Sequence, residues 1–589
     1  MKRFFSVFLG SMAAIWVSII LGGVLLLLTF MAIGMSNFTS SKTAEIRKHS
    51  VLKIELSGEI VERQMPLDLF EKLSDNSQVT TALDELLAVI DNAANEKNIE
   101  GIVLDCKDVS VGLAQSQAIR QALLKFKESG KWIYSYGDNY SQIDYYIASV
   151  ADSIFINPIG MVDIHGLMAT NIYFKDLLDK LGIDVQVVKV GTFKSAVEPF
   201  ILNESSEANR KQQEHYLNSF WSVIKQEIAK KRGVSETEID SWANGYIFSD
   251  SVGSYIDNHI VDNMLYRRQF NELVVRSSGL KADDLPRYVS VQNYINAKNP
   301  LDSKKRGMEI AVLYAVGDIT ESDDGGIASD RLVPQILELA EKDEIDGLIL
   351  RINSGGGSAF ASEQIWEALE QFKQKTKKPF YVSMSDVAAS GGYYIACGAD
   401  KIYADPLTIT GSIGIFGLIP DVHKLLNDKL GVHTSVVSTN QGHFPSFFNA
   451  MSPGQREAMQ DYVNRGYELF VKRVAEGRKM SVDSVKSIAE GRVWDGITAS
   501  RIGLVDKLGS LELAISDMAK EIGAADKYYI ESYPKIKPQW WEPFFSMDYD
   551  MEGKYIRSKL GRFAPFYDAA TKLSDLDPLQ CRMDYVIIR

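Results

Sequence analysis

The first apolar stretch of the chain, from Phe4 to Met35, carries no charge and exceeds the roughly 20 residues that a helix needs to cross a bilayer. Basic residues flank it on both sides, and no clear small-x-small cleavage site follows it. The pattern therefore predicts a retained membrane anchor rather than a removed signal peptide. We expect the N-terminus in the cytoplasm and the bulk of the chain outside the membrane.

Beyond this stretch, short apolar runs of strand length alternate with helical segments. The second half shows the alternation clearly, with strands expected at Leu348–Ile352, Phe380–Ser383 and Lys401–Ala404 and helices at Ser362–Lys373 and after Ser390. This order predicts an α/β fold whose strands are joined by helical crossovers. Ligands of such folds sit at the ends of the strands.

The two halves of the chain repeat each other. Ile99-Glu-Gly-Ile-Val-Leu-Asp falls on Ile345-Asp-Gly-Leu-Ile-Leu-Arg, and Tyr145-Tyr-Ile-Ala falls on Tyr393-Tyr-Ile-Ala. Further matches pair Gly58 with Gly317, Tyr216 with Tyr462 and Val261 with Val505. Because the offsets stay close to one value, the chain is interpreted as two copies of one unit. We divide it into an anchor (1–45), a first repeat (46–300), a second repeat (301–535) and a C-terminal tail (536–589).

Composition narrows the class of function. The chain of 589 residues is too long for one core, and its 46% hydrophobic and 24% charged residues are ordinary for a folded protein. A net charge of −13 argues against nucleic acid as a partner, since that would need a basic face. Cys106, Cys397 and Cys581 are widely spaced and odd in number, which favours neither a disulfide framework nor a zinc site. We expect no metal and no cofactor, and interpret Cys397 as a small buried residue.

The candidate chemistry centres on Ser390, where an apolar strand runs into the small-residue turn Ala388-Ala-Ser-Gly-Gly. A serine at the start of a helix has an exposed oxygen, and the free N–H groups of the first turn lie beside it. That arrangement suits a nucleophile whose attack creates an oxyanion. Taken alone, the motif favours a tightly packed strand-to-helix turn, since short motifs match readily by chance.

Comparison of the two copies sharpens this hypothesis. Ser390 falls on Gln142 in the first repeat, and Lys194 of the first repeat falls on Gly442 in the second. Each copy has kept one half of a Ser/Lys pair, so we expect the dyad to assemble between the repeats. The glycine-rich segment after Arg351 suits an oxyanion hole and lacks the Gly-Lys-Ser/Thr ending of a phosphate-binding loop.

Four motifs together resemble the signal peptide peptidase A (protease IV) family, in its long, duplicated and membrane-anchored form. They are Gly191-Thr-Phe-Lys194-Ser-Ala-Val-Glu-Pro-Phe, Arg351-Ile-Asn-Ser-Gly-Gly-Gly-Ser, Ala388-Ala-Ser390-Gly-Gly-Tyr-Tyr and Thr410-Gly-Ser412-Ile-Gly. The resemblance covers nearly the whole chain. It implies two tandem domains of the Clp protease/crotonase fold after an N-terminal transmembrane helix, and a homotetramer.

The resemblance also implies roles for individual residues. Ser390 would be the nucleophile, Lys194 the general base and Ser412 a hydroxyl that holds the lysine amine. Backbone N–H groups of Gly357 and Gly391 would form the oxyanion hole, with Gly356 beside them. The family's Asn-Ser-Pro-Gly-Gly reads Asn-Ser-Gly-Gly-Gly here, and the missing proline, at Gly355, leaves the loop less restrained.

A lysine acts as a base near neutral pH only when its surroundings disfavour its charge, since its reference pKa is roughly 10.4. We therefore expect Lys194 in an apolar pocket with neutral hydrogen-bonding partners. The rival mechanism is a Ser/His/Asp triad, for which His443, next to Gly442, is the candidate histidine.

The function implied is that of a serine endopeptidase of the bacterial inner membrane, single-pass with its catalytic bulk in the periplasm, which degrades cleaved signal peptides and other small hydrophobic peptides. Its partners would be these peptides and the lipid around the anchor. The alternatives are a crotonase-like acyl-CoA enzyme, which would need acid/base carboxylates, and a noncatalytic membrane scaffold. Reciprocal loss of the half-sites argues against the scaffold.

Overall fold

The computed structural model describes residues 45–64, 80–301, 306–322, 326–524, 527–535, 580–583 and 587–588, with residues 12, 16–18 and 21–23. Most of the predicted membrane anchor and most of the predicted tail lie outside these residues. Among the helices that the structure describes, none is long and apolar enough to cross a membrane.

The first half of the chain forms a parallel sheet in the order β9-β1-β3-β4-β5-β8, with β2 added beside β1. Apolar residues of β1 and β3 are almost completely buried between the sheet and its helices. The strands are β1 (Ser50–Val61), β2 (Thr80–Ala82), β3 (Ile99–Ser110), β4 (Trp132–Gly137), β5 (Ser153–Ile156), β8 (Asn263–Met264) and β9 (Arg287–Ser290).

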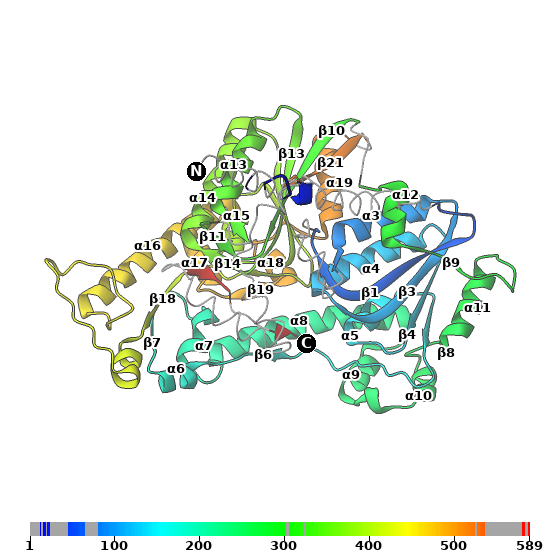
Figure 1. The fold of residues 1–589 in the computed structure, drawn as a ribbon, viewed down its shortest axis with the longest axis horizontal. Helices are drawn as coiled ribbons and strands as arrows, with labels where there is room; N and C mark the ends of the chain where they lie inside the picture. The colour runs from blue at the N-terminus through cyan, green and yellow to red at the C-terminus, as the bar shows by residue number, and fades with distance from the viewer. Residues whose placement is uncertain are drawn as a thin grey trace, which may run out of the picture.

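Helices on both faces cover this sheet (Figure 1). They are α3 (Leu83–Asn95), α4 (Leu113–Lys127), α5 (Gln142–Ala148), α8 (Glu207–Arg232), α9 (Glu236–Asn244), α10 (Val252–Asp257), α11 (Arg267–Ser277) and α12 (Val291–Lys298). The parallel order with helical crossovers is the one that the alternating pattern predicts.

The second half repeats the same sheet as β21-β10-β13-β15-β16-β20, again parallel throughout. Beyond β15 it adds β17 and, antiparallel to it, β19. The strands are β10 (Met308–Val316), β13 (Ile345–Ser354), β15 (Phe380–Ala389), β16 (Lys401–Ala404), β17 (Ile409–Gly411), β19 (Val493–Asp495), β20 (Lys507–Leu508) and β21 (Tyr528–Tyr533). The duplication expected from the sequence is therefore visible strand by strand.

The helices of the second half occupy matching places. They are α13 (Ser329–Ala340), α14 (Ala359–Thr376), α15 (Gly391–Ala396), α16 (Pro453–Arg478), α17 (Val482–Ile488), α18 (Gly496–Arg501) and α19 (Leu511–Glu521). Tyr216 and Tyr462, matched in the sequence, lie on the corresponding long helices α8 and α16. The expected helix at Ser362–Lys373 is longer than the pattern indicated, since α14 runs from Ala359 to Thr376 and is capped by Ser358.

A third sheet joins the two halves in the order β12-β11-β14-β22-β18-β7. In it β7 of the first half pairs antiparallel with β18 of the second half, and together they form the arm at the left of Figure 1. The strands are β7 (Asp184–Lys189), β11 (Ile319–Thr320), β12 (Ile327–Ala328), β14 (Gly356–Ser358), β18 (Phe416–Asp421) and β22 (Gln580–Arg582). Short elements complete the fold, namely α6 (Lys175–Leu181), α7 (Glu198–Ile201) and the pair β6 (Ala169–Thr170) and β23 (Ile587–Ile588).

Candidate active site

Ser390 lies where β15 ends and α15 begins, and its side chain is completely buried. Its backbone has φ +55° and ψ −114°, a conformation that residues with a Cβ rarely adopt and that costs on the order of 1–3 kcal/mol. The N–H of Ser390 donates to the carbonyl of Gly411 at 2.8 Å, and its own carbonyl accepts from the N–H of Tyr394. Pairing with β17 and the first turn of α15 together hold this strained turn, as in other strand-to-helix nucleophile turns.

Lys194 follows β7 in a loop that packs against residues 490 and 491 of the second half. The N–H of Phe193 donates to the carbonyl of Glu490 at 3.0 Å. A Cβ on Gly491 would lie 2.7 Å from the Cβ of Lys194, so only glycine allows this approach. The lysine is 1% exposed, which leaves its amine inside the protein.

The structure brings Lys194, Ser390 and Ser412 together. The Nζ atom of Lys194 lies 2.6 Å from the Oγ atom of Ser390 and 3.1 Å from that of Ser412. It also donates to the carbonyl oxygen of Ser412 at 3.3 Å. All three partner atoms are neutral oxygens, and residues 196 positions apart meet across the two halves of the chain.

The glycine-rich loop lies beside Ser390. Gly356 has φ +101°, and a Cβ on it would stand 2.7 Å from the nitrogen of Gly391, so this loop packs directly on the start of α15. The N–H of Gly356 donates to the Oγ atom of Ser354 at 3.1 Å. Gly356 thus shapes the loop, while the N–H of Gly357 acts on the thiol of Cys581 and Gly391 directly follows Ser390 in the chain.

The corresponding place in the first repeat is filled by its own side chains. The carboxylate of Asp144 accepts from the N–H groups of Asp108, at 2.9 Å, and Val109, at 3.5 Å, which occupy the position of the glycine-rich loop. Gln142, at the position of Ser390, donates to the carbonyl of Gly166 and accepts from its N–H. The polar groups that a second site would need are engaged with each other.

Two further polar residues support the lysine loop. Gln212 of α8 donates to the carbonyl of Phe193 and accepts from the N–H of Val493, so it ties the lysine loop to β19. Glu198, which stands in the motif around Lys194, begins α7 and accepts from the hydroxyl and N–H of Ser206. Gln212 belongs to no pattern that distinguishes it from an ordinary helix residue.

The C-terminal strand β22 lies in the site. It runs antiparallel to the glycine-rich strand β14, with Cys581 opposite Gly357, and its other edge meets β18. The sulfur of Cys581 lies 3.8 Å from the Oγ atom of Ser362, and a Cβ on Gly391 would come within 3.0 Å of that sulfur. Burial raises the pKa of the Cys581 thiol, while the charge of Lys194 and the hydroxyls of Ser362 and Ser390 act in the opposite direction. The thiol therefore lies directly against the dyad.

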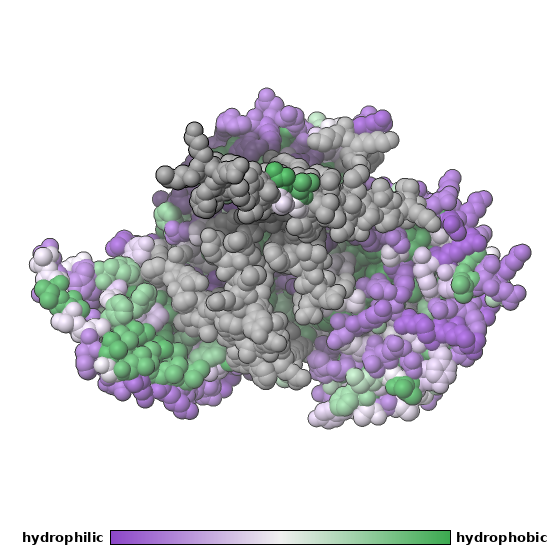
Figure 2. Space-filling model, viewed as in Figure 1, coloured by the Kyte–Doolittle hydropathy of each residue, from purple (hydrophilic) through white to green (hydrophobic). Residues whose placement is uncertain are grey.

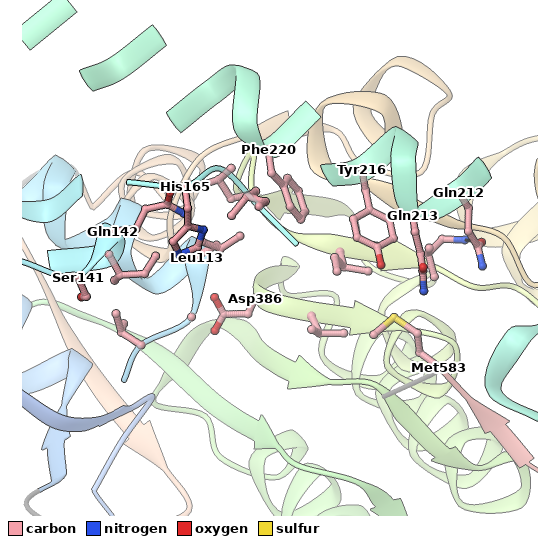
Figure 3. Close-up of a pocket in the computed structure, with 18 of the residues that line it drawn as sticks. Leu113, Ser141, Gln142, His165, Gln212, Gln213, Tyr216, Phe220, Asp386 and Met583 are labelled. Carbon is pink, nitrogen blue, oxygen red and sulfur yellow. Dashed lines mark hydrogen bonds between the residues drawn. The ribbon is translucent and has the colours of Figure 1, made fainter. Parts of the chain in front are cut away.

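A cavity of about 490 Å³ adjoins the site at the boundary of the two halves. Figure 3 shows Met583, which follows β22, at one end and Gln142 at the other. Tyr216 and Phe220 project from α8 on one side, and Asp386 lies on the opposite side.

The remaining candidates lie away from the dyad. His443 is exposed in the segment between β18 and α16, where its ring contacts Gln455 and the carbonyl of Phe444. Cys397 is buried behind α15, and its thiol donates to the carbonyl of Tyr394. In the structure the basic residue that contacts Ser390 is therefore Lys194, and not His443 of the rival hypothesis.

A buried serine on a strained turn, a buried amine at hydrogen-bonding distance and a glycine-rich loop on a duplicated α/β fold define a serine hydrolase. Comparisons with known proteins agree with this class. The sequence model of peptidase family S49 matches residues 125–275 and 372–525, and that of Clp protease matches residues 319–407. The chain belongs to peptidase family S49 and is a serine peptidase built of two tandem family domains.

Relatives over most of the chain carry the same activity in their names. Protease 4 of Salmonella typhi is 34% identical over 512 residues, which cover 84% of this chain and 82% of the relative. Protease 4 of Haemophilus influenzae is 35% identical over 442 residues, covering 73% and 72%. The chloroplastic serine protease SPPA of Arabidopsis thaliana is 27% identical over 482 residues, covering 80% and 69%. The protein is therefore a peptidase, and the two alternatives, an acyl-CoA enzyme and a noncatalytic scaffold, do not describe its class.

Proposed function

We propose that Ser390 and Lys194 form the catalytic dyad of a membrane-anchored endopeptidase. The observation that carries the proposal is the 2.6 Å contact between the amine and the hydroxyl, both buried and drawn from different repeats. The neutral amine takes the proton of Ser390 as its oxygen attacks the peptide carbonyl. The N–H groups of Gly357 and Gly391 receive the oxyanion.

The second half of the cycle uses the same groups. The protonated amine gives its proton to the leaving nitrogen, and the acyl-enzyme is then hydrolysed by a water that Lys194 deprotonates. Ser412 holds the amine through its hydroxyl and its carbonyl, which keeps the lone pair directed at Ser390. No metal or cofactor is required by this chemistry.

Labelling with a serine-directed acylating probe across pH tests the dyad. Wild type should be labelled with a rate that rises with pH, and Ser390→Ala should not be labelled. Lys194→Ala and Lys194→Arg should both lose on the order of 10⁴ in rate, because a guanidinium can donate a hydrogen bond but is not deprotonated. His443→Ala is the matched control and should behave as wild type. Equal labelling of all variants would end the proposal.

The substrates proposed are cleaved signal peptides and other small hydrophobic peptides, degraded at the outer face of the bacterial inner membrane. Support comes from the apolar run Phe4–Met35 and from the family resemblance of the motifs around Ser390. Deleting residues 4–35 should release activity from the membrane fraction into the soluble fraction. Activity that sediments unchanged without this segment would contradict the anchor.

A homotetramer is proposed as the assembled form. Figure 2 shows apolar side chains gathered over the arm at the left, and this surface includes Leu177, Leu430, Val436, Val437 and Phe444, each more than half exposed. Apolar surface of this kind marks sites of association. Val437→Asp should lower the mass measured by light scattering, whereas Leu285→Asp, on an exposed position of the first repeat, should not.

A further inference from the structure

The place of β22 shows how an extended peptide lies in this site. Cys581 stands opposite Gly357 and Arg582 opposite Gly356, and the N–H of Met583 donates to the carbonyl of Gly355 at 2.7 Å. Main-chain pairing with an exposed strand is a common way to bind peptides without regard to their sequence. β22 is thus a peptide of the protein's own chain, held by β14 and β18 beside Ser390.

Side chains alternate along such a strand, so every second residue faces the same side. Cys581 faces Ser362 and Gly391 next to the dyad, and its side chain is completely buried. Met583, two residues later, lines the cavity of about 490 Å³ (Figure 3). The cavity is several times larger than one methionine side chain.

The cavity lies where the first repeat would have its own site, since Asp108, Val109 and Gln142 line it. Asp144 and Gln142 fill the former catalytic positions and satisfy the N–H groups of the surrounding loops. Asp386, on the opposite wall, accepts from the N–H groups of Ala114 and Gln115 at the start of α4. With these polar groups engaged, apolar side chains form much of the wall, among them Val111, Leu113, Leu167, Phe220, Leu407 and Ile409.

We propose that this cavity is a subsite for a large apolar side chain of the bound peptide, two residues C-terminal to the side chain that faces Ser390. The inference rests on the proposed peptidase function and adds its sequence preference. The disused half of the duplication thereby serves the working half. Burying one such side chain favours binding by roughly 1.5–3 kcal/mol, or on the order of ten- to a hundredfold.

Substitutions at Leu167 test the subsite, because this residue lines the cavity from a loop that takes no part in the dyad. Its neighbour Met168 is 56% exposed and provides the matched control. The substrates are fluorogenic peptides in which one leucine moves one position at a time through an alanine background. Wild type should cleave one of these peptides fastest, the one whose leucine stands at a single position C-terminal to the side chain that faces Ser390.

Leu167→Trp fills the cavity and should remove this preference, lowering kcat/KM on the best leucine peptide about tenfold relative to the all-alanine peptide. Met168→Trp should keep the wild-type profile. Leu167→Ala enlarges the cavity and should move the optimum at that position from leucine to phenylalanine or tryptophan. Two results would overturn the subsite. One is a wild-type profile in both Leu167 variants. The other is an equal loss on every peptide in Leu167→Trp together with an unchanged optimum in Leu167→Ala. If wild type cleaves none of the peptides, the peptidase proposal itself fails.

Discussion

Ser390 and Ser412 both have a positive φ, +55° and +53°, although neither is glycine. The motifs around them in the sequence indicated function, but not this strain. The strain arises from hydrogen bonds to residues far along the chain, since the N–H of Ser412 donates to the carbonyl of Arg492 and that of Ser390 to Gly411. Local sequence therefore indicated both serines as candidate site residues, whereas the geometry that arranges them depends on tertiary contacts.

Ser412→Ala should lower kcat by roughly 10- to 100-fold with little change in KM. The substitution removes one hydroxyl contact to the amine at 3.1 Å but leaves the carbonyl contact at 3.3 Å, so positioning is weakened and not abolished. Steady-state kinetics across pH measure the effect. Ser446→Ala, in the segment before α16, is the control, and a loss confined to KM would contradict a role in positioning.

Asp405 gives a pH dependence that can be assigned to one residue. Burial raises the pKa of Asp405 to about 7, so the folded state favours its neutral form. Its stabilising contribution is complete below the unfolded pKa of about 4 and is lost as the pH rises to about 7.

Asp405→Asn keeps an oxygen acceptor for the N–H of Leu407 and cannot ionise. It should leave the free energy of unfolding unchanged at pH 4 and raise it by on the order of 2–4 kcal/mol at pH 8. Denaturant unfolding at the two pH values measures this, with Asp428→Asn on the exposed segment as control. An equal effect at both pH values would count against the assignment.

At the scale of elements, the sequence predicted three strands of the second half, β13, β15 and β16, but gave no role to the tail. Short apolar runs in the sequence indicated β13, β15 and β16, because the residues of these strands are buried on both faces of the sheet. The strand β22 is three residues long and contains glutamine, cysteine and arginine. It is a strand only because β14 and β18 offer it hydrogen bonds, and such a cause leaves no local pattern.

Binding of a peptide in the groove should expose Cys581. All three cysteines are buried, and Cys106 and Cys397 lie in the cores of the two halves. In Ser390→Ala, a saturating uncleaved peptide should displace β22 and raise the rate of alkylation of Cys581 at least tenfold. Cys106 and Cys397 are internal controls that should stay protected, as mass spectrometry of the digested protein would show. Protection of Cys581 in the presence of bound peptide would mean that β22 does not leave.

At the scale of the whole molecule, side chains from one repeat complete structures of the other. Glu62 of the first half pairs with Arg351 of the second at 2.9 Å, and both are buried. Burial alone would raise the pKa of Glu62, but the charge and hydrogen bonds of Arg351 hold it below its usual value. The sequence predicted the repeats because residues at matching positions of the two copies are alike. The pair Glu62 and Arg351 joins positions that do not match each other in the alignment of the copies.

Glu62→Gln should destabilise the protein by about 3–5 kcal/mol, because the charge of Arg351 is left buried without its counterion. Thermal unfolding measures the loss. Glu62→Gln combined with Arg351→Met should recover part of it, and Asp179→Asn, in an exposed ion pair with Lys175, should have no measurable effect. A double variant as unstable as the single one would contradict this account.

Because β22 belongs to the same chain as the groove, its competition with substrate is intramolecular. Its strength is set by an effective concentration, which diluting the enzyme does not change. A free peptide therefore binds with an apparent affinity that is lower by a constant factor, and KM is raised by that factor, which is set by the ratio of filled to empty groove. At any given peptide concentration the enzyme would be less saturated with substrate than the same enzyme without β22.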